Sequence, residues 1–141
     1  MINGVIAQKL QSLDSVLAEL RSLGRITAKE LAMDWRTKKA VERNLQILVE
    51  IVIDTCQRLL SLTGQSPATT GRDAIERAIQ HGFIRHDEAY FKMVQFQNFV
   101  VHRYERVDDD ILSAMVNQRL SDFEQFRNDV MNYVRSSAGR P

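Results

Sequence analysis

The sequence predicts an all-α protein, an up-and-down bundle of four to five main helices that forms one domain over residues 1–141. Its length of 141 residues suits a single domain. Apolar residues recur at spacings of three and four along most of the chain, which is typical of amphipathic helices. Only six glycines and two prolines interrupt this pattern. Short connections between the helices favour antiparallel neighbours.

The first helix is expected between Ile2 and Leu23. Its apolar residues follow the spacing of one buried face and are Ile2, Val5, Ile6, Leu10, Leu13, Val16, Leu17, Leu20 and Leu23. Gly24 follows directly and suits the end of a helix. The run from Thr27 to Glu30 has the pattern of a capping box and predicts a short turn of helix.

A longer helix is expected from about Asp34 to Thr63, and it carries apolar residues on two faces. The first stripe contains Val41, Leu45, Leu48, Val52, Cys56 and Leu59, and the second contains Ile47, Ile51 and Leu62. A helix that is apolar on two faces is expected at the centre of a bundle. The run Gly64–Pro67 ends it, because proline cannot continue the hydrogen-bond ladder.

Three more helices complete the prediction. A short helix spans roughly 71–80 and is closed by His81 and Gly82. The next spans roughly 88–102, with Asp87 as its N-cap. Asp108 is expected to cap a single last helix that extends past Tyr133, with a frayed tail over 136–141.

Composition narrows the classes of function. The net charge is only +1, with 19 basic and 18 acidic residues, so the chain is not expected to coat nucleic acid without specificity. The single cysteine, Cys56, excludes an intramolecular disulfide and is interpreted as a buried core residue. No segment has the length and apolar character of a signal peptide or a membrane span, which predicts a cytoplasmic protein that does not bind membranes.

Histidine chemistry concentrates interest near residue 102. His81 and His86 are interpreted as capping or surface residues, and no histidine pair has the spacing of a metal site. Asn98 and His102 are four residues apart and share a helix face. Gln97 places a polar group on an otherwise apolar stripe, where it needs a partner. From periodicity alone, a satisfied polar patch at a helix end is the favoured interpretation of this cluster.

The same run resembles the HEPN motif of HepT-type toxins, which consists of arginine, a polar residue, three further residues, histidine, any residue and tyrosine. Here the run is Gln97, Asn98, Phe99-Val100-Val101, His102, Arg103 and Tyr104. Flanking residues also match the family's pattern, and they are Phe96, Val101, Glu105, Val107 and Asp108. Upstream, the run 42–46 with Glu50 and Asp54 is similar to the family's long helix, so the resemblance extends from about Val41 to the last helix.

This resemblance implies a HEPN-like fold and an endoribonuclease that needs no metal and no cofactor. Its site would lie in a cleft between the two subunits of a homodimer. That arrangement answers a geometric objection, because residues five apart point about 140° from each other on one helix. His102 would be the general acid or base towards the RNA substrate. Gln97 stands where the family has its catalytic arginine, so weaker activity is expected, and Arg103 and Arg106 are candidate RNA contacts.

The resemblance also implies a partner, an MntA-type minimal nucleotidyltransferase antitoxin that transfers AMP from ATP to Tyr104. The added charge and bulk would keep RNA out of the cleft. Two alternatives remain open. One is a catalytically inactive HEPN module for dimerisation and partner binding, which the missing arginine and the low net charge favour for this chain. The other is an unrelated helical-bundle interaction protein, which the run from Asn98 to Asp108 disfavours.

Overall fold

The computed structural model describes residues 2–102 and 108–138, and the side chains of 4–98 and 108–137. Every secondary-structure element in these ranges is a helix, which confirms the predicted fold class. The elements are α1 (Ile2–Ser22), α2 (Ala28–Met33), α3 (Trp35–Leu62), α4 (Gly71–Gln80), α5 (Glu88–His102), α6 (Asp109–Gln118) and α7 (Leu120–Ala138). None of the helices in the described ranges is both long and apolar enough to span a membrane.

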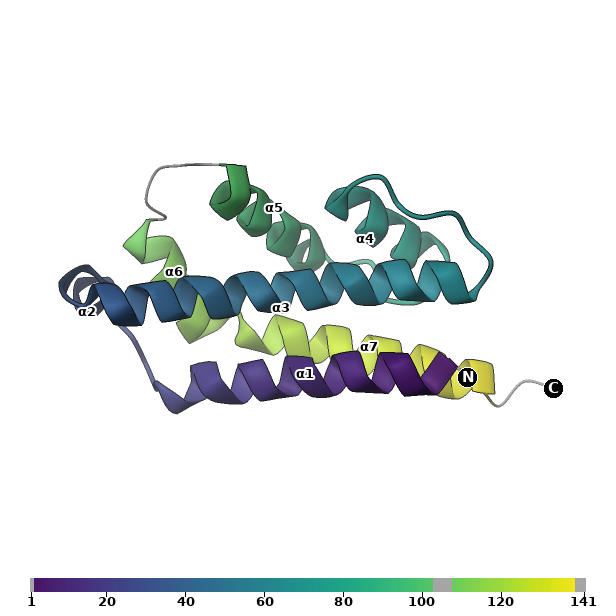
Figure 1. The fold of residues 1–141 in the computed structure, drawn as a ribbon, viewed down its shortest axis with the longest axis horizontal. Coiled ribbons are helices and arrows are strands. Elements are labelled where there is room, and N and C mark those ends of the chain that lie inside the picture. Colours follow the sequence, from purple (N-terminus) through teal and green to yellow (C-terminus); the bar gives the residue numbers. More distant parts are fainter. Residues whose placement is uncertain (1, 103–107, 139–141) are drawn as a thin grey trace.

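Helix α3 is the central element, as its two apolar stripes predict. It contacts every other helix, with α1 and α7 along one side and α4 and α5 along the other (Figure 1). Its buried residues include Val41, Leu45, Leu48, Val52 and Cys56. All are fully buried, so the prediction that Cys56 is a core residue is confirmed. A single contiguous core follows from this arrangement.

Local side-chain chemistry sets the first helix boundaries where the sequence predicts them. Helix α1 ends at Ser22, and Gly24 follows with a φ of +68°. Glycine adopts this left-handed conformation at little cost, so Gly24 allows the chain to leave the helix. The Thr27 hydroxyl accepts a hydrogen bond from the Glu30 amide at 3.1 Å at the start of α2. Asp34 then caps α3 and accepts from the backbone amides of Arg36 and Thr37.

The last helix was expected to be continuous, and this prediction is wrong. The structure ends α6 at Gln118 and begins α7 at Leu120, although no glycine or proline lies nearby. The Asn117 carboxamide accepts from the Ile26 amide at 3.0 Å and donates to the Ile26 carbonyl at 2.7 Å. Helix α6 packs on α2, whereas α7 packs on α1. Because the two helices pack against different neighbours, the chain changes direction between them. Helix α7 then continues to Ala138, into the segment expected to fray.

Candidate functional site

Helix α5 presents the first half of the predicted motif. Asp87 caps the helix, as the sequence predicts, because its Oδ1 accepts from the Ala89 amide at 2.9 Å. Tyr90, Met93 and Val94 bury one face of the helix against the core. Gln97 is half-buried and Asn98 is exposed. The carboxamide of Asn98 therefore lies at the protein surface, whereas Gln97 lies at the edge of the core.

The second half of the motif is only partly described. The backbone of α5 is helical through His102, the last residue before the segment that the structure does not describe. The side chain of His102 lies outside the described residues, as do Arg103, Tyr104 and Arg106. The predicted alignment of Asn98 with His102 on one helix face therefore rests on their spacing in a described helix.

A nearly buried ion pair fixes the residues that follow this segment. Lys38 of α3 places its Nζ 2.6 Å from Oδ1 of Asp109 in the first turn of α6, and the lysine side chain is only 5% exposed. Asp108 caps the same helix by accepting from the Asp110 amide at 2.7 Å. The ion pair thus attaches the start of α6 to the first turns of α3. The sequence analysis predicts the Asp108 cap but misses the counter-ion of Asp109, which the isolated acidic run 108–110 could have signalled.

Glu42 adds a buried acceptor at the same end of α3, one turn beyond Lys38. Its Oε2 atom is buried and has no hydrogen-bond donor within reach in the described part of the chain. The nearest ion-pair partner among those residues is Lys39, with its Nζ at 3.9 Å. A buried carboxylate oxygen without a donor is costly. This end of the bundle therefore combines a buried lysine with two acidic side chains of different helices.

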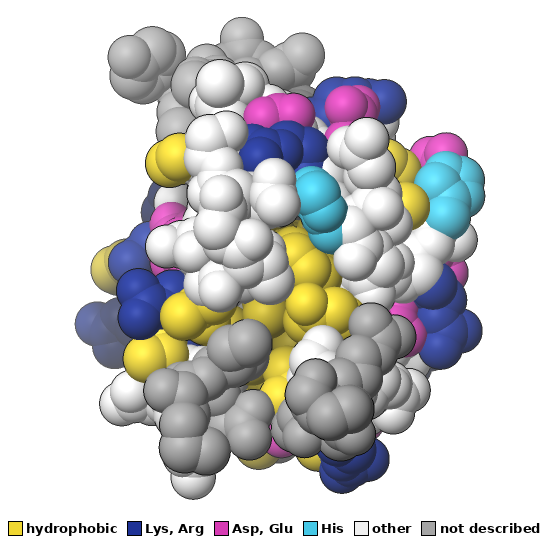
Figure 2. All heavy atoms as spheres, turned by 90° about the vertical axis from the view of Figure 1, so that its right-hand side faces the viewer, with side chains coloured by type: hydrophobic (Ala, Val, Ile, Leu, Met, Phe, Trp, Pro, Cys, Tyr) yellow, Lys and Arg dark blue, Asp and Glu magenta, His cyan; other side chains and the backbone are white. Residues whose placement is uncertain are grey.

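The other two histidines lie at the opposite end of the molecule. His81 and His86 are both exposed, which confirms the prediction of surface residues. His81 stacks on Phe83 and lines a hollow of about 520 Å³ together with Arg85, Asp129 and Tyr133. Figure 2 views this end and shows hydrophobic side chains at the bottom of a hollow, with a histidine at its rim.

A network of polar side chains occupies one wall of this hollow. Asp129 of α7 is nearly buried and accepts three hydrogen bonds, from the Arg85 amide, from Arg85 Nε and from the Tyr90 hydroxyl at 2.6 Å. Burial and the bond to Asp129 raise the pKa of Tyr90 well above its usual value. Gln125 donates to Asp87, which lowers the pKa of that carboxyl. With its acceptors satisfied, this cluster joins α7 to the start of α5.

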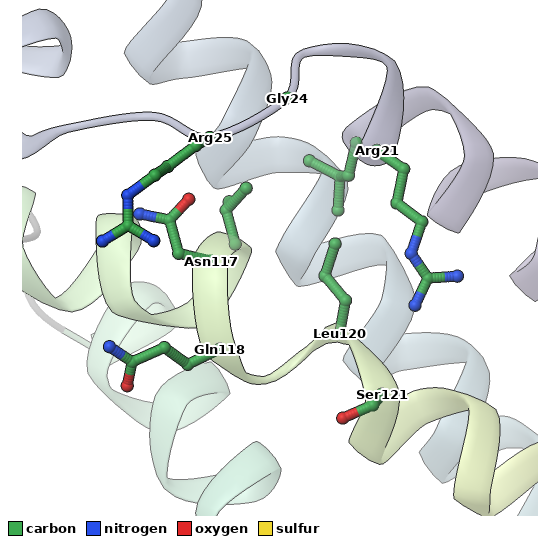
Figure 3. A pocket seen from close by; sticks show the side chains of 9 residues that line it. Arg21, Gly24, Arg25, Asn117, Gln118, Leu120 and Ser121 are labelled. Carbon is green, nitrogen blue, oxygen red and sulfur yellow. The ribbon is translucent and has the colours of Figure 1, made fainter.

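A second pocket of about 320 Å³ lies where α1 ends and α6 meets α7. Figure 3 shows Arg21 and Arg25 on its two sides, with Asn117 between them. Arg21 forms an ion pair with Glu124, which raises the arginine pKa and lowers the glutamate pKa. Asn117 is held by Ile26. These contacts attach the end of α1 and the loop before α2 to α6 and α7. The polar residues of the pocket therefore stabilise the fold.

The protein-family comparison matches one model over most of the chain. The description of this model is Ribonuclease HepT-like, and it covers residues 13–130. The matched range contains all of α2–α6 and the whole run from Gln97 to Tyr104.

Individual relatives agree with the family match. The mRNA nuclease HepT of Shewanella oneidensis is 24% identical over 127 residues, which is 89% of this chain and 95% of that protein. The tri-AMPylated Shewanella oneidensis HEPN toxin, solved in complex with its MNT antitoxin, superimposes with a TM-score of 0.82 at 23% identity, over 92% of this chain and 98% of that one. A toxin–antitoxin complex with AMP-PNP gives a TM-score of 0.79 at 23% identity and the same coverage. At this identity the likeness to the two solved structures concerns the fold.

Proposed function

The chain belongs to the HepT-like ribonuclease family, and from this premise we propose that it is the toxin of a toxin–antitoxin pair and acts on RNA at the end of helix α5. The observation that carries the proposal is the run Gln97, Asn98 and His102, which lies in the last described turns of α5 inside the matched range. The alternative of an unrelated helical bundle is thereby removed.

The proposed reaction needs little from the protein, because RNA carries its own nucleophile. The 2′-hydroxyl attacks the neighbouring phosphorus, and this step requires a proton acceptor, a proton donor and a group that stabilises the added negative charge. An imidazole titrates near neutrality and can serve in either proton-transfer role, so we assign it to His102. Asn98, one turn before it, orients the ring.

Gln97 is the weak point of this site. A glutamine can donate hydrogen bonds to a phosphate but brings no positive charge, whereas an arginine supplies two parallel charge-assisted bonds. Loss of one donor that acts only in the transition state typically costs about 10²–10³ in rate. Arg103 and Arg106 are candidate contacts for the RNA backbone, and the alternative is that both are solvated arginines with no part in the reaction.

A homodimer completes the proposed site. Two residues five apart on an ideal helix point about 140° from each other, so Gln97 and His102 of one subunit do not converge on one phosphate. A twofold mate brings a second copy of the motif to face the first and forms a cleft from both. The half-buried position of Gln97 at the edge of the core is consistent with a residue at such an interface.

Tyr104 is the proposed site of regulation by a nucleotidyltransferase antitoxin. The Shewanella relative is described as tri-AMPylated and as bound to an MNT antitoxin. Transfer of AMP to Tyr104, two residues beyond His102, adds phosphate charge and an adenosine beside the cleft and excludes RNA. Transfer of AMP to Tyr104 does not use residue 97, so we expect it to occur in this chain although residue 97 is glutamine.

RNA cleavage by three chains tests the proposed reaction. We expect weak or undetectable cleavage by the chain as it stands, a gain of about 10²–10³ with Gln97→Arg, and none with Gln97→Arg combined with His102→Ala. No gain with the arginine would favour the second candidate function, a catalytically inactive module for dimerisation and partner binding. The uncharged Gln97 and the net charge of +1 are the observations in its favour.

Modification of Tyr104 is tested by intact mass. Incubation with the MNT-type antitoxin and ATP is expected to raise the mass of the chain in steps of one AMP, and Tyr104→Phe is expected to abolish the first step. The matched control is Tyr133→Phe, because Tyr133 is a half-buried tyrosine of α7 that packs against Phe83. An unchanged mass, with an antitoxin that modifies another HepT-like toxin, would contradict this role.

A further inference from the structure

Two large apolar side chains are strongly exposed at the junction between α2 and α3. Met33, the last residue of α2, is 78% exposed, and Trp35, the first residue of α3, is 65% exposed. Tryptophan is usually well covered by protein, so an exposed indole suggests a contact with another molecule. The backbone here is fixed, because Asp34 accepts hydrogen bonds from the Arg36 and Thr37 amides and from the Thr37 hydroxyl.

Three positively charged side chains share the helix face of this tryptophan. The guanidinium of Arg36 lies 5.6 Å from the centre of the Trp35 ring. The side chains of Lys39 and Arg43 are 70% and 61% exposed. On an ideal helix these four positions fall within an arc of about 100° and span about 12 Å. We call Trp35, Arg36, Lys39 and Arg43 the α3 stripe.

The negative charges close to the α3 stripe are mostly engaged elsewhere. Asp34 is bound to the backbone that it caps, and these bonds lower its pKa. Glu42 and Glu50 approach Lys39 and Arg43 only at 3.9 Å, the outer limit of an ion pair. The aspartates of α6 line a separate groove with Lys29 and Lys38. Among the exposed residues within 36–43, three are basic and none is acidic.

The α3 stripe lies at the same end of the molecule as the proposed catalytic motif. Lys38 belongs to the same helical turn as Trp35 and Lys39, and its Nζ is 2.6 Å from Asp109 at the start of α6. The segment that joins the end of α5 to α6 contains Tyr104. Figure 1 shows the start of α3, the end of α5 and the start of α6 at one end of the bundle.

We propose that the α3 stripe binds single-stranded RNA, with Trp35 stacking on a base and Arg36, Lys39 and Arg43 contacting phosphates, and so guides the strand to the site at the end of α5. This inference rests on the proposed function. Single strands are bound by aromatic platforms set among basic residues, because every base has a face that can stack and every linkage carries a charge. About 12 Å accommodates about three stacked nucleotides at about 3.4 Å each. Tryptophan and arginine are also enriched at protein interfaces, but three basic residues beside one aromatic ring match the repeating phosphates and bases of a single strand.

The inference is testable by fluorescence because Trp35 is the only tryptophan of the chain. The probe is a fluorescein-labelled 12-mer of 2′-O-methyl RNA, which binds as a single strand but lacks the free 2′-hydroxyl and is not cleaved. Binding is measured at several salt concentrations, by probe anisotropy and by quenching of Trp35. We expect both signals to follow one titration curve.

Four variants separate the stripe from the rest of the surface. Trp35→Ala is expected to weaken binding about tenfold, and Trp35→Phe by less, because a phenyl ring still stacks. Lys39→Gln combined with Arg43→Gln is expected to weaken binding and to reduce the slope of log affinity against log salt by about 1.4, at about 0.7 per phosphate on a single strand. The matched control is Arg72→Gln on α4. Arg72 is also an exposed arginine that lies over an aromatic ring, 4.9 Å from the centre of Phe91. This variant is expected to bind the RNA as tightly as the parent protein.

The outcomes separate this inference from the proposed function. If RNA binds without quenching Trp35, and Trp35→Ala binds it with unchanged affinity, the α3 stripe is not the RNA-binding surface. This conclusion would hold even if Gln97→Arg cleaves RNA. Quenching with the predicted losses of affinity, but no cleavage by any variant, would keep the stripe and remove the nuclease. If Trp35→Ala abolishes binding of the antitoxin and leaves RNA affinity unchanged, the stripe is a protein-docking surface and the inference is wrong.

Discussion

At the scale of single residues, the structure distinguishes side chains that stabilise the fold from those that remain available for function. Asp129 is the clearest case of the first kind, since the Arg85 amide, Arg85 Nε and the Tyr90 hydroxyl all donate to one nearly buried carboxylate. Asn98 and Trp35 are of the second kind, because both are exposed on well-formed helices. Substitutions at these two kinds of site should therefore have separate effects on stability and on RNA.

Substitution of Asp129 should destabilise the fold. Asp129→Ala leaves the Tyr90 hydroxyl and the Arg85 amide without an acceptor and removes a partly buried ion pair, at a cost of about 3 kcal/mol. Tyr90→Phe removes one hydrogen bond and should cost about 1 kcal/mol. Urea unfolding followed by circular dichroism measures both. A cost for Asp129→Ala within about 0.5 kcal/mol, the range of ordinary surface substitutions, would contradict the network.

Tyr90 also predicts how stability depends on pH. Its folded pKa is raised, so the neutral phenol contributes stability below the unfolded pKa of about 10, and this contribution is lost as pH rises from there towards the folded pKa. The free energy of unfolding should fall more steeply above pH 10 in the parent than in Tyr90→Phe. Parallel curves for the two proteins between pH 9 and 11 would show that the phenol is equally easy to ionise in both states.

Cys56 should be inert in the native protein. It is fully buried, and burial raises the pKa of its thiol to about 12, so the reactive thiolate is scarce at neutral pH. We expect no modification by iodoacetamide at pH 7.5 within the time that fully labels the chain in 6 M guanidinium chloride. Rapid native labelling, followed by intact mass, would indicate that α3 opens locally.

At the scale of elements, helix α3 connects the core to the proposed site. Its buried apolar residues extend from Val41 to Leu60, whereas its N-terminal part carries Lys38 on one face and the α3 stripe on another. The ion pair with Asp109 fixes α6 against this N-terminal part. The position of α6 beside the motif therefore depends on this ion pair together with the packing of α6 on α2.

The Lys38–Asp109 pair should be coupled in a double-mutant cycle. Removal of either partner leaves the other charge poorly solvated, and because Asp109 is a quarter exposed the expected cost is about 1–3 kcal/mol for each single alanine. Both substitutions together should cost less than the sum, with a coupling energy of about 1 kcal/mol or more. In the Gln97→Arg background, Lys38→Ala should also slow RNA cleavage. Strict additivity in unfolding would show that the pair does not form in solution.

At the scale of the whole molecule, local sequence patterns predicted most of the helix boundaries and the central position of α3. Asp34, Asp87 and Gly24 act on their immediate neighbours, so their effect can be inferred from a few residues. The break at Arg119 could not be inferred in this way, because it depends on the bonds of Asn117 to Ile26, 91 residues away in the sequence. The same holds for the contact of Arg85 with Asp129.

The candidate site shows the same division. The order of Gln97, Asn98 and His102 is visible in the sequence, and the family match covers it. The counter-ion of Asp109 is not visible there, since Lys38 belongs to a different helix. The assignment of Gln97 to the arginine position of the HEPN motif comes from the resemblance of the sequence, and its proposed consequence is a lower rate of RNA cleavage, which an assay measures.

The chemical ends of the cleaved RNA test the central claim most directly. If the 2′-hydroxyl is the nucleophile and His102 transfers the protons, Gln97→Arg will release fragments with 2′,3′-cyclic phosphate and 5′-hydroxyl ends, and it will do so in excess EDTA. The same chain with His102→Ala will release none. Fragments with 3′-hydroxyl and 5′-phosphate ends, or cleavage that persists without His102, would contradict the account.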